Sequence, residues 1–376
     1  MNPPTLTRRK FVGQLSITAA ALAFARRGIA ADTAPSTTTA AGRKLGVALV
    51  GLGSYATGQL GPSLRQTQNC HLAGVVTGSP EKGKKWASDY GFSEKSVYGY
   101  DTMARMADNP EIDIVYVVTP NALHSEHVIA AAQAGKHVIS EKPFTATVAQ
   151  AEAAMAACAK AKVRLSIGYR LHFDPYHQTL IKMAKDPAVG GFKKGSGNFS
   201  FTMGRKVWRA EKALAGGGPI MDLGVYLIQG ACMAAGGVAP IAVTAHEGPK
   251  TRPDMFTDVE ETMIFQLEFP NGLIFDGSTS YQQNGNEIRA ESAGGKEFIH
   301  IRPAFGYDGL RGETQAGPLS FKLPVKQQAL QMDDFAACVR ANLPSRVPGE
   351  MGLRDMKIIE AIYAAASSGK RVEIKA

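Results

Sequence analysis

The sequence predicts a two-domain α/β protein, with a doubly wound parallel sheet first and an α+β domain with a large, mostly antiparallel sheet second. Two observations carry this prediction. Up to residue 167, short apolar runs alternate with helical patterns, as β-α units require. Beyond that point, β-rich runs follow one another with turns such as Asn271-Gly272 between them, as in antiparallel sheets. A chain of 376 residues is long enough for two such domains.

The first apolar run, Leu45 to Val50, predicts a strand buried on both faces. It leads into Gly51-Leu52-Gly53-Ser54-Tyr55 and Ala56, which match the G-x-G-x-x-A fingerprint of a Rossmann dinucleotide site. The first glycine permits a sharp turn, and the second lets a pyrophosphate approach the backbone. The pattern is weak alone, and a glycine turn that binds nothing is the alternative. A second apolar run from His71 to Val76, at the expected distance, favours the dinucleotide site.

The end of this second strand favours NADP over NAD. In many NAD-binding Rossmann domains an acid at this place accepts hydrogen bonds from the ribose hydroxyls and repels a 2′-phosphate. Here the strand is followed by Thr77, Gly78 and Ser79, which offer hydroxyls, and by Lys82, which offers positive charge. Glu81 is the nearest acid, and its place in the following turn predicts that it faces solvent.

Two further strands continue the pattern: Ile112–Val118, which leads to a helix from His124 to Ala134, and His137–Ser140. Ligands of a doubly wound sheet bind at the carboxyl ends of its strands. The cofactor site is therefore predicted to include His124 and the residues that follow these strands: Thr119, Pro120, Asn121, Glu141 and Lys142. Lys142, placed between an acid and a proline at a strand end, is predicted to be catalytic.

The remaining runs predict the rest of both domains. In the first domain we expect a helix over Ala149–Ala161 and a last strand over Val163–Ile167. In the second domain we expect the strands Asn198–Thr202, Ile241–Ala245, Thr262–Phe269, Leu273–Tyr281 and Lys296–Ile301, and the helices Lys326–Ala341 and Gly349–Ser368.

The start of the chain resembles a twin-arginine export signal. Arg8 and Arg9 precede an apolar stretch, and the small residues Ala30 and Ala31 follow it. We therefore predict a signal peptide over residues 1–31, export by the twin-arginine machinery and a periplasmic location. As a class, the substrates of this machinery are exported already folded. A linker rich in Thr, Ala and Ser follows over residues 32–43.

The composition argues against several classes of function. Five basic residues precede the first acid, Asp32, and account for more than half of the formal net charge of +9. The rest of the chain therefore gives no indication of a nucleic-acid partner. The four cysteines form no Cys-x-x-Cys pair, and His124 and His127 lack a third ligand, so we predict no metal site.

A catalytic pattern stands in the second half, where Gly216-Gly217-Gly218-Pro219 is followed by Asp222 and Tyr226. Residues four apart lie on one face of a helix, and Pro219 suits the first turn of that helix. We expect the three glycines to let a substrate approach. The alternative is structural: a flexible loop leads into a helix, with the tyrosine in the core and the aspartate near the positive end of the helix.

Five motifs, in this order and spacing, resemble the Gfo/Idh/MocA oxidoreductase family: GLGSYA, TPNALH, GKHVISEKPF, SIGYRLHFDP and LAGGGPIMDLGVY. Within the family they are most similar to the glucose-fructose and aldose-aldose oxidoreductases. The resemblance extends over nearly the whole chain from Lys44 onward. It implies a dinucleotide-binding domain over residues 44–166 and a substrate-binding, catalytic α+β domain over residues 167–376. Most of the family has histidine where this chain has Tyr226, whereas the glucose-fructose oxidoreductase branch has tyrosine.

The resemblance also implies the roles of the site residues. Tyr226 is the acid/base, Lys142 is its electrostatic partner and a hydrogen-bond donor to the sugar, and Asp222 orients the sugar or the lysine. A phenol with a reference pKa near ~10 is a poor base at neutral pH, so it needs a cation beside it. The sugar hydroxyls are assigned to Arg170, His172 and Arg209, and Arg170 is assigned to the cofactor as well.

The leading hypothesis is an exported NADP-dependent sugar oxidoreductase that oxidises an aldose at C1 to its lactone and reduces a second sugar with the same tightly bound cofactor. Outside the cytoplasm there is no free nicotinamide pool, and a cofactor that stays bound and alternates between two sugars needs none. A conventional NAD(P)-dependent sugar or cyclitol dehydrogenase is the enzyme alternative. A non-catalytic sugar-binding protein with an inert Rossmann frame is the alternative from another class. We expect a homo-oligomer.

Overall fold

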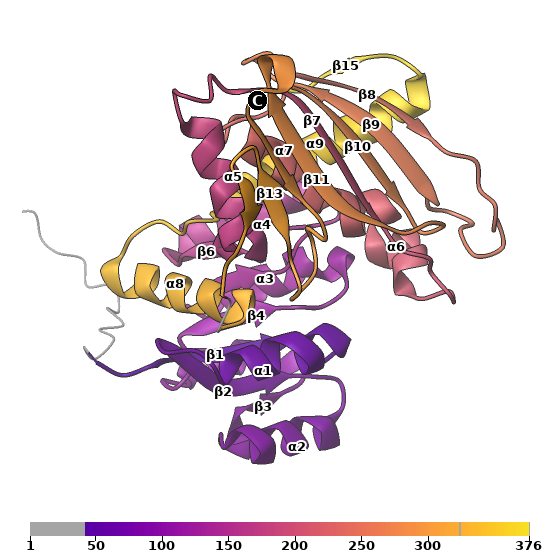
Figure 1. Cartoon of the computed structure of the whole chain (residues 1–376). Coiled ribbons are helices and arrows are strands. Elements are labelled where there is room, and N and C mark those ends of the chain that lie inside the picture. The colour runs from indigo at the N-terminus through magenta and orange to yellow at the C-terminus, as the bar shows by residue number, and fades with distance from the viewer. Residues whose placement is uncertain (1–41, 323–324, 376) are drawn as a thin grey trace, which may run out of the picture. The chain divides into compact units, whose positions relative to one another are not determined.

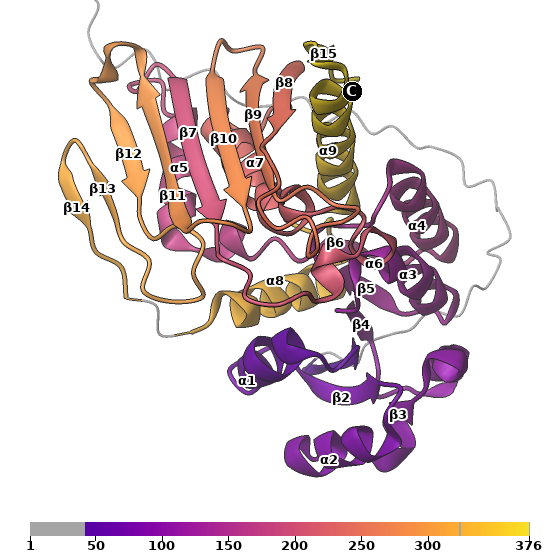
Figure 2. The same cartoon turned by 90° about the vertical axis from the view of Figure 1, so that its right-hand side faces the viewer.

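The computed structural model describes residues 42–322 and 325–375. The predicted signal peptide over residues 1–31 and most of the linker over residues 32–43 lie outside the described residues. Within the described ranges the strands form two sheets, one of six strands and one of nine (Figures 1 and 2). The α/β architecture with two different sheets, predicted from the sequence, is thereby confirmed. In the same ranges no helix is both long enough and apolar enough to span a membrane.

The first sheet is parallel throughout, with the strand order β3-β2-β1-β4-β5-β6 of a doubly wound fold. Its strands are β1 (Leu45–Val50), β2 (Cys70–Val76), β3 (Val97–Tyr98), β4 (Ile114–Val117), β5 (His137–Ser140) and β6 (Leu165–Ile167). The helices that connect them are α1 (Gly61–Leu64), α2 (Pro80–Tyr90), α3 (His124–Gln133) and α4 (Val148–Ala161). Residues of β1 alternate between two apolar clusters, since Val47 and Leu49 belong to one and Ala48 and Val50 to the other. Both faces of the sheet are therefore covered, as the apolar run predicted.

Helix α8 (Gln327–Ala341) comes from the end of the chain and packs on this first sheet (Figure 2). Its side chains Met332, Phe335 and Ala336 belong to the same apolar cluster as Val47 and Leu49. The carboxylate of Asp333 on this helix accepts hydrogen bonds from the backbone N–H groups of Gln68 and Asn69, just before β2. The first half of the fold therefore includes residues from beyond position 326.

The second sheet is mixed, with the strand order β14-β13-β12-β11-β7-β10-β9-β8-β15. Neighbouring strands are antiparallel apart from β7 and β10, which run parallel. Its strands are β7 (Phe192–Ser200), β8 (Ala242–Glu247), β9 (Thr262–Glu268), β10 (Ile274–Ser280), β11 (Gly285–Ser292), β12 (Phe298–Ile301), β13 (Gly312–Thr314), β14 (Gly317–Leu319) and β15 (Val372–Glu373). The other helices of this half are α5 (Pro175–Lys185), α6 (Lys212–Ala215), α7 (Val225–Ala234) and α9 (Gly349–Ser368).

The sequence reading missed strands where glycine or charge interrupts the apolar pattern. Strand β7 begins six residues earlier than predicted and contains Gly195 and Gly197. A Cβ at Gly195 would lie 2.5 Å from Phe275, and one at Gly197 would lie 2.8 Å from Leu227. These glycines make room for large side chains of neighbouring elements, so an apolar pattern is absent although the strand is central. Strand β11, which alternates charged and apolar residues, was not predicted at all.

Candidate active site

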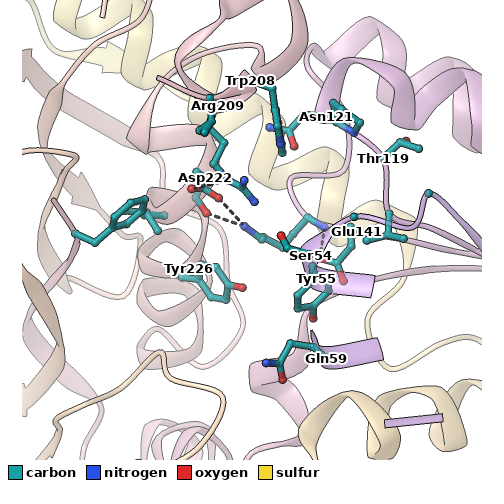
Figure 3. A pocket seen from close by; sticks show the side chains of 18 of the residues that line it. Ser54, Tyr55, Gln59, Thr119, Asn121, Glu141, Trp208, Arg209, Asp222 and Tyr226 are labelled. Carbon is teal, nitrogen blue, oxygen red and sulfur yellow. Dashed lines mark hydrogen bonds and ion pairs between the residues drawn. The ribbon is translucent and has the colours of Figure 1, made fainter. Parts of the chain in front are cut away.

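A cavity of about 970 Å³ opens beside the carboxyl ends of β1, β4 and β5 and is closed on its other side by residues of the second half. Figure 3 shows Tyr55 and Gln59 on one side of it and Arg209, Asp222 and Tyr226 on the other. Most of the predicted site residues line it: Gly51, Leu52, Gly53, Ser54, Tyr55, Thr119, Pro120, Asn121, His124, Glu141, Lys142, Arg170, Arg209, Asp222 and Tyr226. Five predicted residues are not among those that line it: Thr77, Gly78, Ser79, Lys82 and His172.

The glycine loop after β1 has the form that a dinucleotide requires. Gly51 has φ of +97°, in the region that disfavours other residues, and carries the chain through the turn. A Cβ built on Gly53 would meet no atom within 4 Å, so its backbone is open to the cavity. The helix that follows begins at Ser54, and its first backbone N–H groups lack partners within the helix. Open backbone at a helix start is suited to a pyrophosphate, so these residues fit a dinucleotide.

The turn after β2 lies at the edge of this loop. Ser79 caps α2 by accepting a hydrogen bond from the backbone N–H of Lys82, and the hydroxyl of Thr77 accepts one from the N–H of Ser79. The ammonium of Lys82 donates to the backbone carbonyl of Leu52 in the glycine loop. Glu81 is exposed and pairs with Lys84 at 3.2 Å. The predicted orientation of Glu81 is confirmed, and no carboxylate from this turn points toward the loop.

The ring of His124 lies between the segments that follow strands β4 and β5 and contacts both. One ring nitrogen lies 2.8 Å from the backbone carbonyl of Thr119, after β4, and the other lies 2.9 Å from that of Pro143, after β5. The ring is fully buried, and burial lowers the pKa of His124 to about 4. The side chain of Asn121 donates to the backbone carbonyl of Ala215 at 2.8 Å. His124 and Asn121 therefore shape the cavity wall largely through contacts with the main chain.

Glu141 is a buried carboxylate in the cavity wall. Its Oε1 accepts a hydrogen bond from the hydroxyl of Tyr116 at 2.7 Å, and its Oε2 accepts one from the backbone N–H of Lys142 at 3.2 Å. Burial raises the pKa of Glu141, and the bond from Tyr116 acts against that rise. The tyrosine hydroxyl is itself held by Gln331 of α8, so the same helix that closes the first sheet also supports this wall.

Asp222 is the centre of a charged cluster. The ammonium nitrogen of Lys142 lies 2.7 Å from the backbone carbonyl oxygen of Asp222 and 3.4 Å from its Oδ1. Its other carboxylate oxygen is 3.1 Å from Nε of Arg209 and accepts a hydrogen bond from Tyr281 at 3.2 Å. Burial acts to raise the pKa of Asp222, but Arg209 and Lys142 outweigh it and hold the pKa below its ordinary value. Asp222 therefore binds the lysine, one of its two predicted roles.

Tyr226 stands beside two cations. The ammonium of Lys142 lies 4.7 Å from the centre of its ring, and the guanidinium of Arg170 lies 5.1 Å from it. The ring packs edge-on against Phe199 and near Phe305, and its hydroxyl points toward Tyr55 in Figure 3. A cation at this range is attracted by the ring itself. The structure thus adds Arg170 to the cation predicted for this tyrosine.

Arg170 is held in the cavity wall by protein groups, and its Nε has no hydrogen-bond partner among the described residues. It is 1% exposed, and it donates to the backbone carbonyls of Phe305 (2.6 Å) and Gly306 (2.9 Å) and to the side chain of Gln327 (2.6 Å). Its guanidinium also lies 4.7 Å from the ring centre of Tyr307. These contacts fix its charge beside Tyr226.

His172 and the triple glycine differ from their predicted roles. One ring nitrogen of His172 lies 2.9 Å from the side-chain oxygen of Gln229, and burial lowers the pKa of His172 to about 4. It lies behind Tyr226, in the wall of a small separate void. Gly216, Gly217 and Gly218 are absent from the cavity lining, so we withdraw the expectation that they admit the substrate.

Sequence reasoning missed several aromatic residues of the site. Trp208, Tyr281 and Tyr307 contact the charged cluster or line the cavity, and burial raises the pKa of Tyr281 and of Tyr307, so both remain hydrogen-bond donors. The signal for Tyr281 was present, since it ends a predicted strand. In residues 42–322 and 325–375, no group of three or more His, Cys, Asp or Glu side chains could hold a metal ion.

Comparison with known proteins agrees with this geometry. The family model for the oxidoreductase family with an NAD-binding Rossmann fold matches residues 45–169, and the GFO/IDH/MocA C-terminal domain matches residues 177–300. The chain belongs to the Gfo/Idh/MocA oxidoreductase family. Its first half is therefore an NAD(P)-binding Rossmann fold. When bound there, a nicotinamide dinucleotide supplies the hydride acceptor and donor of the family's redox chemistry.

Within the Gfo/Idh/MocA family, one solved structure is similar over nearly the whole chain: aldose-aldose oxidoreductase from Caulobacter crescentus, complexed with glycerol. It is 40% identical, with a TM-score of 0.85, and the match covers 88% of this chain and 100% of that one. A curated relative, D-xylose 1-dehydrogenase [NADP(+)] of Haloarcula marismortui, is 27% identical over 89% of this chain and 95% of its own. A levoglucosan dehydrogenase, in complex with NADH and levoglucosan, shares the fold at 19% identity, with a TM-score of 0.76 over 89% of this chain and 100% of that one.

Proposed function

We propose that this protein is an exported NADP-dependent sugar oxidoreductase that oxidises an aldose at C1 to its lactone and then reduces a second sugar with the same, unreleased cofactor. The observation that carries the proposal is the meeting of Lys142, Asp222 and Tyr226 in one cavity with the open glycine loop. The 40% identity with an aldose-aldose oxidoreductase over nearly the whole chain supports the choice of substrates.

The cluster is suited to move a proton at an anomeric hydroxyl. Oxidation at C1 removes a hydride from carbon and a proton from oxygen. Tyr226 accepts the hydroxyl proton, with the cations of Lys142 and Arg170 beside its ring. The ammonium of Lys142, held by Asp222, donates a hydrogen bond to the same sugar oxygen. In the second half of the cycle Tyr226 returns the proton to the oxygen of the sugar that is reduced, so the residues regain their first state.

NADP is proposed over NAD because of the turn after β2. Its acid, Glu81, faces away and pairs with Lys84, so nothing in that turn repels a 2′-phosphate. The hydroxyls of Thr77 and Ser79 accept backbone hydrogen bonds and can still donate their own protons. Lys82, held at the glycine loop, adds positive charge beside them. The name of the xylose dehydrogenase relative, which specifies NADP(+), is in line with this choice.

The test follows the absorbance band of reduced nicotinamide in protein purified without added cofactor. We expect the band to rise in a single turnover when an aldose is added, and to fall when a second sugar follows, with no nucleotide in the filtrate. The band would stay unchanged with every sugar if the protein only bound sugars. A band that rises but falls only after free NAD(P) is exchanged would also overturn the two-sugar cycle.

The second candidate is a conventional NAD(P)-dependent sugar dehydrogenase. It is favoured by the relatives, which include xylose and glucoside dehydrogenases that match 89% and 88% of this chain. The two candidates differ in cofactor release, so ultrafiltration after one turnover separates them. A dehydrogenase would lose reduced cofactor to the filtrate and would turn over continuously only with added oxidised cofactor.

A further inference from the structure

Glu260 is a buried carboxylate beside the loop that leads to Asp222. Its Oε2 accepts a hydrogen bond from the backbone N–H of Gly218 at 2.9 Å, and its Oε1 accepts one from the N–H of Ile220 at 3.1 Å. The hydroxyl of Tyr363, on α9, lies within 3.1 Å of both carboxylate oxygens. Burial raises the pKa of Glu260, while the three donors act to keep its charge. No atom of Glu260 is assigned to the cavity lining.

The close approach of Glu260 and Tyr363 explains two of the three glycines. A Cβ on Gly217 would lie 1.8 Å from the hydroxyl oxygen of Tyr363, and a Cβ on Gly218 would lie 2.2 Å from the backbone oxygen of Glu260. Any other residue would displace the backbone or one of these two groups. These glycines therefore allow two protein segments to approach each other. This explains why the expectation that they let a substrate approach is withdrawn.

This contact is transmitted to Asp222 through the main chain. Ile220 begins the π-helical segment Ile220–Gly224, and Asp222 is its third residue. A negative charge next to the first N–H groups of a helix is also electrostatically favourable. Because Lys142 is held mainly by the backbone carbonyl of Asp222, a shift of this segment moves the lysine directly.

The neighbouring carboxylate supports Asp222 from its other side. Glu261 accepts a hydrogen bond from Nε of Arg252 at 2.9 Å, and the same guanidinium donates to the backbone carbonyls of Met203 and Tyr281. Tyr281 then donates its hydroxyl to Asp222. Two adjacent buried acids thus support Asp222 in separate ways. Glu260 holds the backbone segment that carries Asp222, and Glu261, through Arg252, holds the Tyr281 that donates to the Asp222 carboxylate.

We infer that Glu260 is a positioning residue, which sets the place of Asp222 and, through the Asp222 carbonyl, that of Lys142 for hydride transfer. The inference rests on the proposed function for its kinetic consequence alone. Its structural content, that Glu260 holds Gly218 and Ile220 and thereby the lysine, does not depend on which sugars react.

The test compares three substitutions in the full chain with its bound cofactor. Glu260→Gln keeps the size of the side chain, but its amide nitrogen cannot accept a backbone hydrogen bond. Tyr363→Phe removes one donor to the same carboxylate. Glu268→Gln is the matched control, because Glu268 is paired with exposed Arg371 at the far end of β9. For each protein we would measure single-turnover cofactor reduction as a function of aldose concentration and determine a crystal structure.

Glu260→Gln should lower the limiting rate constant about 10- to 100-fold, since small misplacements of reacting groups cost this much. The aldose concentration at half-saturation should change less than about 3-fold, because Glu260 does not contact the cavity. Tyr363→Phe should lower the same rate constant by a smaller factor, and Glu268→Gln should leave it unchanged. In the crystal structure of Glu260→Gln, the distance from Lys142 Nζ to the Asp222 carbonyl should exceed hydrogen-bonding range.

The inference would be overturned if the limiting rate constant were unchanged in both Glu260→Gln and Tyr363→Phe. It would also be overturned if these substitutions changed only the aldose concentration at half-saturation. An undisturbed distance between Lys142 and Asp222 in both crystal structures would overturn it as well, whatever the rates. If no aldose caused the unmodified protein to reduce its bound cofactor, the proposed function would fail, and the crystal structures would still decide the positioning role. If Glu260→Gln does not fold, Tyr363→Phe, which removes only one oxygen, carries the same two readouts.

Discussion

The ammonium of Lys142 is held more closely by the main chain of Asp222 than by its carboxylate, at 2.7 Å from the carbonyl oxygen and 3.4 Å from Oδ1. The lysine is therefore placed by the fold of the Ile220–Gly224 segment as well as by charge. The carboxylate has a second task, since it also binds Arg209 and the hydroxyl of Tyr281. Substitutions at Asp222 should separate these two contributions.

Asp222→Asn should keep Lys142 in place through the backbone carbonyl while removing the negative charge between two cations. We expect the protein to fold and to retain its nucleotide, with single-turnover hydride transfer reduced about 10- to 100-fold, less than the loss from Lys142→Ala. Stopped-flow absorbance of the bound cofactor measures both. A larger loss for Asp222→Asn than for Lys142→Ala would show that the carboxylate contacts the reacting atoms itself.

Tyr226→Phe should fold and keep its nucleotide but lose most hydride transfer, by ~10²- to 10⁴-fold, because it removes one oxygen and preserves the packing of the ring. Lys142→Ala should be at least as damaging. The double variant should lose less transition-state stabilisation than the sum of the losses in the two single variants, since the effects of groups that act as a unit are not additive. The measurement is single-turnover reduction of bound cofactor by an aldose. Near-normal transfer by Tyr226→Phe would remove the tyrosine from the proton transfer.

Thr77→Asp should weaken the retention of NADP and favour NAD. The backbone N–H of Ser79 can donate to the new carboxylate as it does to the threonine hydroxyl, so the turn should persist. The carboxylate would then repel a 2′-phosphate. Retention of each nucleotide after gel filtration measures the change, with Thr77→Ser as the control that keeps the hydroxyl. Equal or better NADP retention in Thr77→Asp would place the phosphate elsewhere.

The stability of the fold should fall as the pH decreases from 7 to 5. Burial lowers the pKa of His124, His137 and His172 to about 4 in the folded chain, whereas an unfolded histidine titrates near 6.5. The unfolded chain therefore binds more protons in this window, and each histidine should cost about 2 kcal/mol of unfolding free energy between pH 7 and pH 5. Glu141 and Glu260 act in the opposite direction, because their pKa is raised by burial.

Urea denaturation at pH 7, 6 and 5 measures this dependence. The substitution His172→Gln removes one titrating group and should reduce the loss of stability between pH 7 and pH 5 by about 2 kcal/mol, whatever it does to stability at pH 7. If the substitution left the change of unfolding free energy with pH unaltered, His172 would have the same pKa in the folded and unfolded chains.

Changing Arg8 and Arg9 together to lysine should leave folded, cofactor-loaded protein in the cytoplasm. The export hypothesis rests on the paired arginines, and lysine keeps the charge without that pair. Cell fractionation followed by measurement of bound nucleotide in each fraction checks this. Undiminished recovery outside the inner membrane would contradict export by this route.

The first half of the fold was predictable because its strands are apolar on both faces. The predicted bounds of strands β1 and β5 agree with the structure, as do those of helix α9 in the second half. Strand β7 was shortened because its glycines make room for Phe275 and Leu227, which no local pattern reveals. Strand β11 was missed because charged residues interrupt its apolar ones.

The site was predictable where a motif places a residue at a strand or helix end, as for Lys142, Asp222 and Tyr226. It was not predictable where motif residues serve the protein interior. Arg170 and His172 belong to one motif, yet one supports Tyr226 and the other faces Gln229 behind it. The role of Glu260 depends on α9 and on a loop some forty residues earlier, a juxtaposition that only the folded chain creates.

Helix α8 determines how late in synthesis the first half of the fold can be completed. A ribosome releases the glycine loop first, but the apolar cluster that contains Val47 and Leu49 stays incomplete until Met332, Phe335 and Ala336 have emerged. The part of the cavity wall that Gln331 supports through Tyr116 therefore forms only when nearly the complete chain is present. By the same logic, the first 166 residues alone should make a poor cofactor module, because the apolar cluster on one face of their sheet would lack Met332, Phe335 and Ala336. A working hybrid has to take α8 from the same parent as β1.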